Sequence, residues 1–225
     1  ATSGLTLAMR LLKEKSDEMD WPGFDETSDV VLTPALTCFA TTAAILANKV
    51  NIRWLDVDLD TANISLDDVK SKLNKNTKVI YLVHWGGNPI DIDELDKICE
   101  EHKLKYGYKP FIVEDCAHSF GAEFNGEKIG SINLVKDNHM CVFSFQAIKH
   151  LTTGDGSLIT LPNKELYERC KLLRWFGIDR NKRNVKGKDF RLENDIVEWG
   201  YKFHMNDINA TIGIYNLPHI SYLLK

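Results

Sequence analysis

Lys149 follows a short apolar segment, a place in the sequence where a charged side chain is unusual. The run from Met140 to Phe145 is typical of a buried strand, and two glycines and a second apolar run, 158–161, come after the lysine. Partial burial strips water from an amine and so favours Schiff-base chemistry. The alternative is a surface lysine in a hairpin loop, and this stretch alone favours neither interpretation.

A possible anion site stands at the start of the chain. Thr2 and Ser3 precede an apolar stripe with helical spacing over residues 5–15. The first N–H groups of a helix have no partner within the helix, which suits a bound phosphate. Threonine and serine are also ordinary helix caps, so this signal is weak by itself.

The elements that must position these residues alternate along the chain. Apolar runs predict strands, and apolar residues at helical spacing predict the helices between them. Continuous apolar strands separated by helices are typical of an α/β fold with three α/β/α layers, in which a mostly parallel sheet is covered on both faces. The predicted strands are 29–32, 50–57, 78–83, 111–113, 140–145 and 158–161. The predicted helices are 5–15, 37–48, 65–75, 91–103, 163–175 and a last one that Asn206 or Asp207 caps and that ends at Leu217.

Polar residues follow several of the predicted strands. In open parallel sheets, ligands bind at the carboxyl ends of the strands. Asp115 and His118 come after the strand 111–113, and Ser144 and Lys149 lie at or beyond the end of the strand 140–145. The turn that begins at His84 likewise follows the strand 78–83, and we therefore expect all of these residues to lie at one edge of the sheet.

Composition excludes several classes of protein. Hydrophobic residues make up 44% and charged residues 27% of the chain, which is ordinary for a globular protein, and the formal net charge of −4 argues against a broad nucleic-acid-binding surface. No apolar run is long enough for a membrane span. The five cysteines are widely spaced, without a zinc-type pair, which suits reduced thiols in the cytoplasm. We expect one domain over residues 1–225, with a mobile, charged surface loop over 179–198.

The combination of a lysine, a carboxylate and an anion site suits pyridoxal 5'-phosphate. That cofactor needs an amine to which its aldehyde carbon binds, a cradle for its phosphate and a carboxylate that keeps its ring nitrogen protonated. Asp115 would be the carboxylate, and Ser144 would reach the phosphate. Each signal is weak singly, but together they favour this cofactor over a dinucleotide, for which no Gly-x-Gly-x-x-Gly follows the first strand.

The chain resembles the DegT/DnrJ/StrS family of sugar aminotransferases, which has the fold type I of pyridoxal-phosphate enzymes. The Glu-Asp-x-Ala-His and Ser-Phe-x₃-Lys-x-Leu-Thr-Thr-Gly motifs are specific, and the matching stretches span almost the whole chain in the family's order. These stretches are Thr2–Leu5, Pro34–Thr37, Val83–Pro89, Val113–Gly121, Phe143–Lys149, Thr152–Gly156 and Gly200–Asp207.

The resemblance implies a role for each matching residue. It implies that Lys149 forms the internal aldimine, that Asp115 pairs with the ring nitrogen and that His118 lies near the ring hydroxyl. It also implies that Thr2, Ser3 and Ser144 hold the phosphate.

Four positions depart from the family's pattern, the mildest being Asp155 in place of the more frequent glutamate. Cys38 stands where an aromatic residue often stacks on the ring, which leaves Phe39 and Trp85 as other candidates for stacking. Lys202 stands where an asparagine often reaches the phosphate of the partner subunit, and His204 stands where arginine is frequent. Lysine still serves a phosphate, as a point charge.

The resemblance also implies a function. Family members move an amino group, usually from glutamate, to a keto group of a nucleotide-linked sugar, and they are cytoplasmic homodimers with a shared active site. A related branch of dehydratases has histidine in place of the aldimine lysine, so Lys149 favours aminotransfer. The chain matches the large domain, with a seven-stranded type of sheet, and lacks the small C-terminal domain. We therefore expect a truncated member, and the alternative is a non-catalytic module for cofactor binding or interaction.

Overall fold

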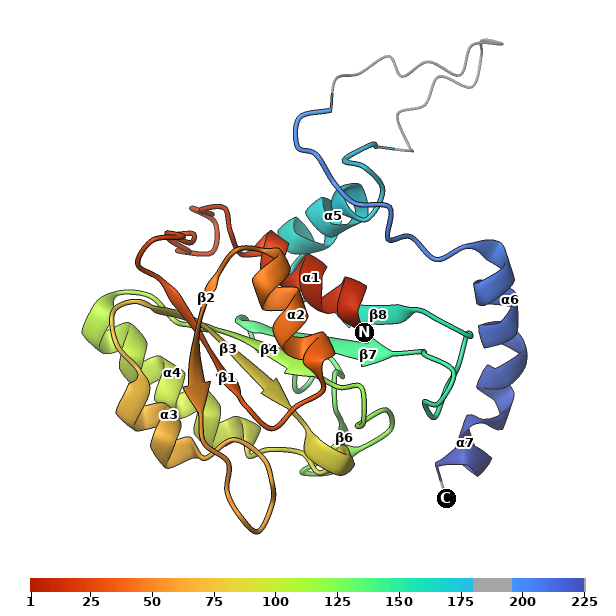
Figure 1. Cartoon of the computed structure of the whole chain (residues 1–225), viewed down its shortest axis with the longest axis horizontal. Coiled ribbons are helices and arrows are strands. Elements are labelled where there is room, and N and C mark those ends of the chain that lie inside the picture. Colours follow the sequence, from red (N-terminus) through yellow and green to blue (C-terminus); the bar gives the residue numbers. More distant parts are fainter. Residues whose placement is uncertain (180–195, 225) are drawn as a thin grey trace.

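Six strands form the central sheet of the computed structural model, which describes residues 1–179 and 196–224 (Figure 1). Their order is β2-β1-β3-β4-β7-β8; the first five are parallel, and β8 runs antiparallel to β7. The strands are β1 (Val30–Pro34), β2 (Asn51–Leu55), β3 (Thr77–Val83), β4 (Phe111–Asp115), β7 (His139–Ser144) and β8 (Ser157–Thr160). A separate small hairpin pairs β5 (Glu123–Phe124) with β6 (Glu127–Lys128).

Helices cover both faces of this sheet, so the predicted three-layer α/β/α architecture is confirmed. On one face, α1, α2 and α5 share an apolar cluster with β1, β3, β4 and β7, and on the other face α3 and α4 share a second cluster with the same strands. The helices are α1 (Thr2–Leu11), α2 (Phe39–Ala47), α3 (Leu66–Lys72), α4 (Ile92–Tyr106), α5 (Lys164–Leu173), α6 (Asp207–Asn216) and α7 (Ile220–Leu223). Short 3₁₀ turns are η1 (Trp85–Gly87) and η3 (Leu217–His219).

Side-chain caps begin four of these helices. The caps are Ser65, Asp91, Asn163 and Asn206, and each accepts a hydrogen bond from the backbone N–H three residues later. Such bonds satisfy donors that a helix start leaves open. The helix predicted over 5–15 is observed as α1, which begins and ends earlier than predicted. Thr2 and Ser3 lie in its first turn rather than before it, and its last residue is Leu11.

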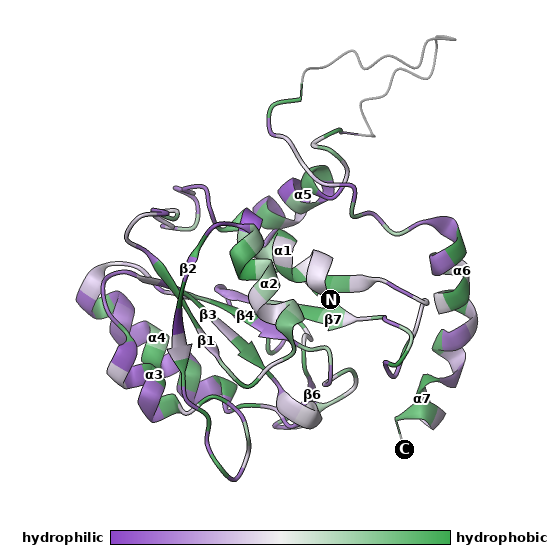
Figure 2. Cartoon of the chain, in the orientation of Figure 1, coloured by the Kyte–Doolittle hydropathy of each residue, from purple (hydrophilic) through white to green (hydrophobic). Residues whose placement is uncertain are grey.

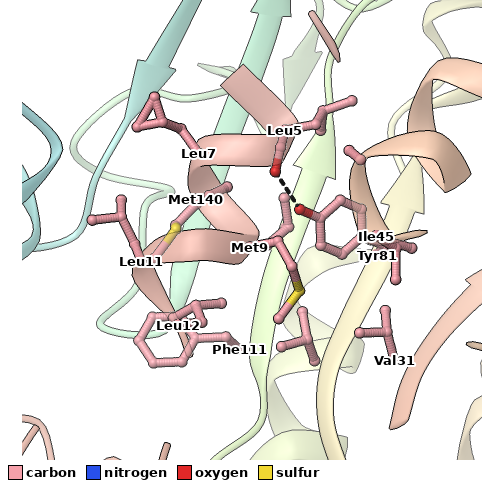
Figure 3. Packing of buried hydrophobic residues seen from close by; sticks show 14 of the residues in the cluster. Leu5, Leu7, Met9, Leu11, Leu12, Val31, Ile45, Tyr81, Phe111 and Met140 are labelled. Atoms are coloured by element: carbon pink, nitrogen blue, oxygen red, sulfur yellow. Dashed lines mark hydrogen bonds between the residues drawn. The ribbon is translucent and has the colours of Figure 1, made fainter. Parts of the chain in front are cut away.

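The first apolar cluster holds α1 against the sheet (Figure 3). Leu5, Met9 and Leu12 are fully buried there, and the Tyr81 hydroxyl from β3 donates to the Leu5 carbonyl oxygen at 2.7 Å. Gly4 allows the close approach: a Cβ at this position would lie 2.7 Å from Val142 Cγ1 and 3.0 Å from Ser157 Oγ. The start of α1 is therefore fixed beside β7 and β8.

All six strands predicted from apolar runs occur in the observed sheet. The sheet has six strands within the described part of the chain, one fewer than the seven expected of the family's large domain. Of the predicted charged loop over 179–198, residues 180–195 lie outside the described residues. Lys202, outside the strands of the sheet, forms an isolated antiparallel bridge with Trp175. None of the helices described here combines the length and apolar content that a membrane span requires.

Candidate active site

A cavity of about 690 Å³ opens at the carboxyl ends of β4 and β7. It lies where the carboxyl end of a parallel sheet meets the start of α1, which is the expected place for a ligand in this architecture. The structure brings all of the site residues predicted from the sequence to this one cavity. They are Thr2, Ser3, Cys38, Asp115, His118, Ser144, Lys149 and Lys202.

Asp115 is the last residue of β4, and its carboxylate is nearly fully buried. Successive side chains of a strand point to opposite faces, so Asp115 points toward α2 while Glu114 points toward the α3 and α4 side. The Thr41 hydroxyl donates to Asp115 Oδ2 at 2.7 Å, and the Ala117 backbone N–H donates to Oδ1 at 3.1 Å. Each carboxylate oxygen has a lone pair left, which suits a further N–H donor in the cavity.

Lys149 lies in the loop between β7 and β8 and is half-buried. Its backbone N–H donates to the Gln146 carbonyl oxygen at 2.9 Å, and the Thr153 N–H donates to the Phe145 carbonyl oxygen at 2.9 Å, so the loop is folded on itself. Among the described residues, none forms a hydrogen bond or ion pair with the Lys149 ammonium. The amine is therefore available to a ligand, although the site removes only part of its hydration.

The start of α1 and the end of β7 meet at the cavity wall. Thr2 and Ser3 are exposed in the first turn of the helix, and the backbone nitrogen of Ala1 lies 3.3 Å from Ser144 Oγ. Free backbone N–H groups, a helix dipole and three hydroxyls therefore gather within one part of the cavity. This combination suits an anionic group such as phosphate.

His118 lies on the loop after β4, and its ring packs edge-on against Trp85 with the centroids 5.6 Å apart. Burial, followed by the neighbouring Lys149 ammonium, lowers the pKa of His118 below its ordinary value. The imidazole is therefore neutral at neutral pH. Its Nδ1 atom is buried without a hydrogen-bond partner among the described residues, so it can take part in a bond to a ligand.

The two aromatic candidates for ring stacking do not lie in the cavity wall. Phe39 is 72% exposed on α2, and Trp85 is occupied with His118. The position beside the cavity belongs to Cys38, which caps α2 with an extended backbone and is exposed. A thiol covers less of an aromatic ring than a second ring does, so stacking at this position is weak.

Lys202 also lines the cavity, and its ammonium is held over an aromatic ring. Lys202 Nζ is 3.7 Å from the centroid of Trp175 and 3.5 Å from Nε2 of His204. The ring centroids of Trp175 and His204 are 4.0 Å apart. A cation over an indole face is attracted to it, so this group of three side chains keeps a positive charge at the rim of the cavity.

Sequence patterns did not identify several of the lining residues. Asn209 is one of them: its Nδ2 group donates to the carbonyl oxygens of Thr153 and Asp155, at 2.7 and 2.9 Å. Asn209 lies in a helix predicted only from its cap, so no local signal connects it to the lysine loop, the segment between β7 and β8 that holds Lys149. The other lining residues that the sequence did not single out for the site include Thr37, Gln146, Ile148, Ser157 and Phe203.

A second buried polar cluster lies on the other face of β4. His84 Nε2 and His139 Nδ1 lie 2.8 and 2.9 Å from the two oxygens of Glu114, and Cys116 is close to the same group. Burial alone would raise the pKa of Glu114, but the hydrogen bonds from His139 and His84 outweigh it and hold that pKa well below its usual range. The Ile90 N–H donates to His84 Nδ1, which leaves the Nε2 proton for Glu114. His84, His139 and Glu114 therefore hold one another in place, while His139 Nε2 lies 3.8 Å from Asp96 Oδ1 and has no hydrogen-bond partner among the described residues.

The residues of the cavity fit pyridoxal 5'-phosphate. They supply an available amine, a buried carboxylate with spare acceptor capacity, a helix start with hydroxyls for a phosphate and an orphaned imidazole nitrogen. Those are the groups that this cofactor requires of a protein.

Comparison with known proteins agrees with this fit. A model of the DegT/DnrJ/EryC1/StrS aminotransferase family matches residues 1–225. An uncharacterised protein of Methanocaldococcus jannaschii is 34% identical over 224 residues, which are 100% of this chain and 52% of that protein. The sugar aminotransferase CalS13 from Micromonospora echinospora has a crystal structure that matches with a TM-score of 0.85 and 38% identity, over 98% of this chain and 55% of that one. AtS13 from Actinomadura melliaura matches with a TM-score of 0.84 and 44% identity, over 98% and 54%. The chain therefore spans about half the length of the proteins that it matches.

Proposed function

Because this chain belongs to the DegT/DnrJ/EryC1/StrS aminotransferase family, whose members use pyridoxal 5'-phosphate, we propose that it is the cofactor-binding part of a sugar aminotransferase. The reaction would move an amino group from an amino acid, glutamate in our proposal, to a keto group of a nucleotide-linked sugar. The observation that carries this proposal is the placement of Lys149 and Asp115 in one cavity with an anion site between α1 and β7.

Each residue of the cavity has a distinct task in this proposal. Bound pyridoxal phosphate would supply a carbonyl carbon for an amine and a ring that withdraws electrons. Lys149 would hold the cofactor through its amine and, once released by the donor amino acid, would move a proton at the substrate carbon. Asp115 would accept a hydrogen bond from the ring nitrogen and keep it protonated. Neutral His118 would bind the ring hydroxyl.

The phosphate would lie against the start of α1. Thr2 and Ser3 contribute hydroxyls from the first turn, and Ser144 contributes one from the end of β7. Backbone N–H groups at a helix start and hydroxyl donors together form strong, charge-assisted bonds to an anion. Binding there would fix the distance of the cofactor from Lys149.

A second subunit would complete the site in our proposal, with Lys202 serving a phosphate across the interface. Figure 2 shows hydrophobic residues along α6 and α7, which lie to the side of the sheet beyond β7 and β8. The exposed apolar residues of this C-terminal segment are Ile208, Ile212, Ile214, Tyr215, Leu217, Tyr222, Leu223 and Leu224. So many exposed apolar side chains in one short segment are typical of an interface. We propose a cytoplasmic homodimer, and sedimentation equilibrium of the purified protein would test its mass.

The decisive experiment is covalent labelling of Lys149. Purified protein would be mixed with pyridoxal phosphate, its visible spectrum recorded, and the adduct reduced with borohydride and mapped by mass spectrometry. We expect the label on Lys149 in the wild type and no label at this site in Lys149→Ala. Lys128→Ala, at a residue that does not line the cavity and that pairs with Glu123, is the matched control and should be labelled like the wild type. A wild type without label at Lys149 would overturn the proposal.

A non-catalytic cofactor-binding module is the second candidate, since the chain spans about half of its relatives' length. Addition of glutamate to the loaded protein discriminates the two. An aminotransferase would transfer the amino group of glutamate to the cofactor. This transfer would bleach the visible band and release 2-oxoglutarate. A module would bind the cofactor and leave glutamate unchanged.

A further inference from the structure

Thr41 uses its hydroxyl in a way that the other helical threonines near it do not. A threonine inside a helix commonly donates to a carbonyl oxygen of its own helix, three or four residues back. Thr6 donates to the Thr2 carbonyl oxygen at 2.8 Å, and Thr42 donates to the Phe39 carbonyl oxygen at 3.1 Å. Thr41, fully buried on α2, instead donates to the Asp115 carboxylate on β4 at 2.7 Å.

The direction of the hydrogen bonds around Thr41 follows from counting protons. A hydroxyl has one proton to donate, and an ionised carboxylate can only accept. The Thr41 proton therefore goes to Asp115. The Thr37 and Thr41 oxygens are 2.7 Å apart, so Thr37 must be the donor to Thr41. The chain of donors runs from Thr37, at the cavity wall, through Thr41 to Asp115.

A proton shared between Asp115 and a ring nitrogen can lie on the carboxylate or on the ring. If the carboxylate is the better base, the proton moves to Asp115 and the ring becomes neutral, which weakens its withdrawal of electrons. A hydroxyl that donates to the carboxylate stabilises its charged form and so keeps the proton on the ring. A chain of two hydroxyls polarises the bond further.

We propose that Thr41, oriented by Thr37, is a positioning residue that holds Asp115 ionised and directed into the cavity. This inference rests on the proposed function, because it concerns the pairing of Asp115 with a pyridoxal-phosphate ring. Thr41 does not itself line the cavity, so it acts only through the carboxylate. The alternative is a purely structural role, in which the bond only provides a buried carboxylate with a hydrogen-bond donor.

The test measures the protonation of the ring nitrogen directly. Protein loaded with pyridoxal phosphate that carries ¹⁵N in its ring is observed by nitrogen NMR, in which protonated and neutral rings have well-separated shifts. Thr41→Val removes the donor and keeps the shape, and Thr41→Ser restores the donor. Thr42→Val is the matched control, because it removes the neighbouring buried hydroxyl whose bond stays within α2. Thermal unfolding of each variant reports folding independently.

We expect the wild type, Thr41→Ser and Thr42→Val to share one protonated-ring shift. In Thr41→Val the equilibrium should move toward the neutral ring by about tenfold or more, as loss of a hydrogen bond to a charged group implies. Thr37→Val, which removes only the upstream donor, should move it in the same direction by less. This variant also keeps the test decisive if Thr41→Val does not fold.

Several results would overturn the inference. An unchanged shift in Thr41→Val, or an unchanged shift in Thr37→Val where Thr41→Val is unfolded, contradicts the positioning role. An equal movement in Thr42→Val shows a general loosening of α2 instead. Failure of the proposed function is seen separately and earlier, as a wild type that holds no cofactor on Lys149, and that result removes the inference as well.

Discussion

Asn209 of α6 donates its amide to two carbonyl oxygens of the loop that follows Lys149, at 2.7 Å to Thr153 and 2.9 Å to Asp155. Asn216, two turns later, donates to the Thr152 carbonyl oxygen at 3.0 Å. One face of α6 is therefore bound to this loop, and the loop in Figure 1 extends from β7 and β8 toward the helix. The position of the lysine loop depends on a helix that comes more than fifty residues later.

The first prediction concerns this attachment. Asn209→Ala should loosen the loop at a cost of about 1–2 kcal/mol, because the Thr153 carbonyl oxygen loses its side-chain donor and the Asp155 carbonyl oxygen loses one of its two. Hydrogen exchange of residues 152–156 should become faster, and the affinity for pyridoxal phosphate should fall. Thr211→Ala is the control, since that hydroxyl donates only to the Asp207 carbonyl oxygen of its own helix. Equal exchange rates in the two variants would contradict the prediction.

The second prediction separates the phosphate site from the ring site. Ser144→Ala should weaken binding of pyridoxal phosphate by about tenfold, since a hydroxyl bond to a charged group is lost, and should leave binding of pyridoxal, which has no phosphate, nearly unchanged. Titration calorimetry with both ligands measures the difference. Ser131→Ala serves as the control, because Ser131 lies outside the cavity and its hydroxyl has no hydrogen-bond partner among the described residues. If Ser144→Ala weakens both ligands equally, the serine does not bind the phosphate.

The third prediction follows from the close approach of α1 to the sheet. Gly4→Ala would place a methyl group 2.7 Å from Val142 Cγ1, so the helix must move outward at a cost of roughly 1–3 kcal/mol. Denaturant unfolding should show this loss of stability. Because the same helix start forms the anion site, affinity for pyridoxal phosphate should also fall.

A glycine substitution in open space provides the comparison for Gly4. Gly107 ends α4 in the left-handed region, and nothing lies within 4 Å of a Cβ there. Gly107→Asn should cost less than Gly4→Ala, since asparagine tolerates that conformation. A larger loss at Gly107 would show that space beside β7 is not what limits Gly4.

The fourth prediction concerns acid stability. Burial opposes the charged form of Asp96, but His139 and the Lys109 ammonium, 2.7 Å away, lower its pKa from 3.8 to about 2. A lowered carboxyl pKa contributes stability that is present above the unfolded value and is lost as the pH falls through the folded value. The free energy of unfolding should therefore fall between about pH 4 and pH 2.

Substitution of Asp96 checks the source of this acid dependence. Asp96→Asn should lose about 1–2 kcal/mol at pH 7 and show a flatter decline below pH 4, since there is no longer a proton to bind. Asp17→Asn is the control, because Asp17 is 86% exposed in its pair with Lys15 and such surface pairs contribute little. Urea unfolding across the pH range measures both. If the free energy of unfolding falls equally steeply with pH in Asp96→Asn and in the wild type, groups other than Asp96 cause the acid dependence.

Local sequence signals were sufficient for much of the fold. The alternation of strands and helices, the cap of the last predicted helix at Asn206 and the strand-end position of Asp115 all follow from patterns within a few residues. The sequence also placed Thr2 beside Lys149, because both belong to ordered motifs of one family. Such features are predictable because the physics that sets them is local or the motif is specific.

Contacts between distant segments were not predictable in the same way. The bond from Thr41 to Asp115 joins α2 to β4, and the bonds from Asn209 join α6 to the lysine loop. Neither threonine nor asparagine carries a signal for its partner, because each is common in helices and at caps. The stacking role considered for Phe39 fails for a related reason, since the direction of a side chain on a helix depends on packing.

The alternation of Glu114 and Asp115 across the sheet has a consequence for how the chain tolerates insertion and deletion. Glu114 belongs to the buried histidines on one face, and Asp115 belongs to the cavity on the other. A deletion of one residue within β4 would exchange the two faces, so the shorter carboxylate would meet the histidines and the longer one would enter the cavity. A single such event would thus disturb the buried polar cluster and the cavity together.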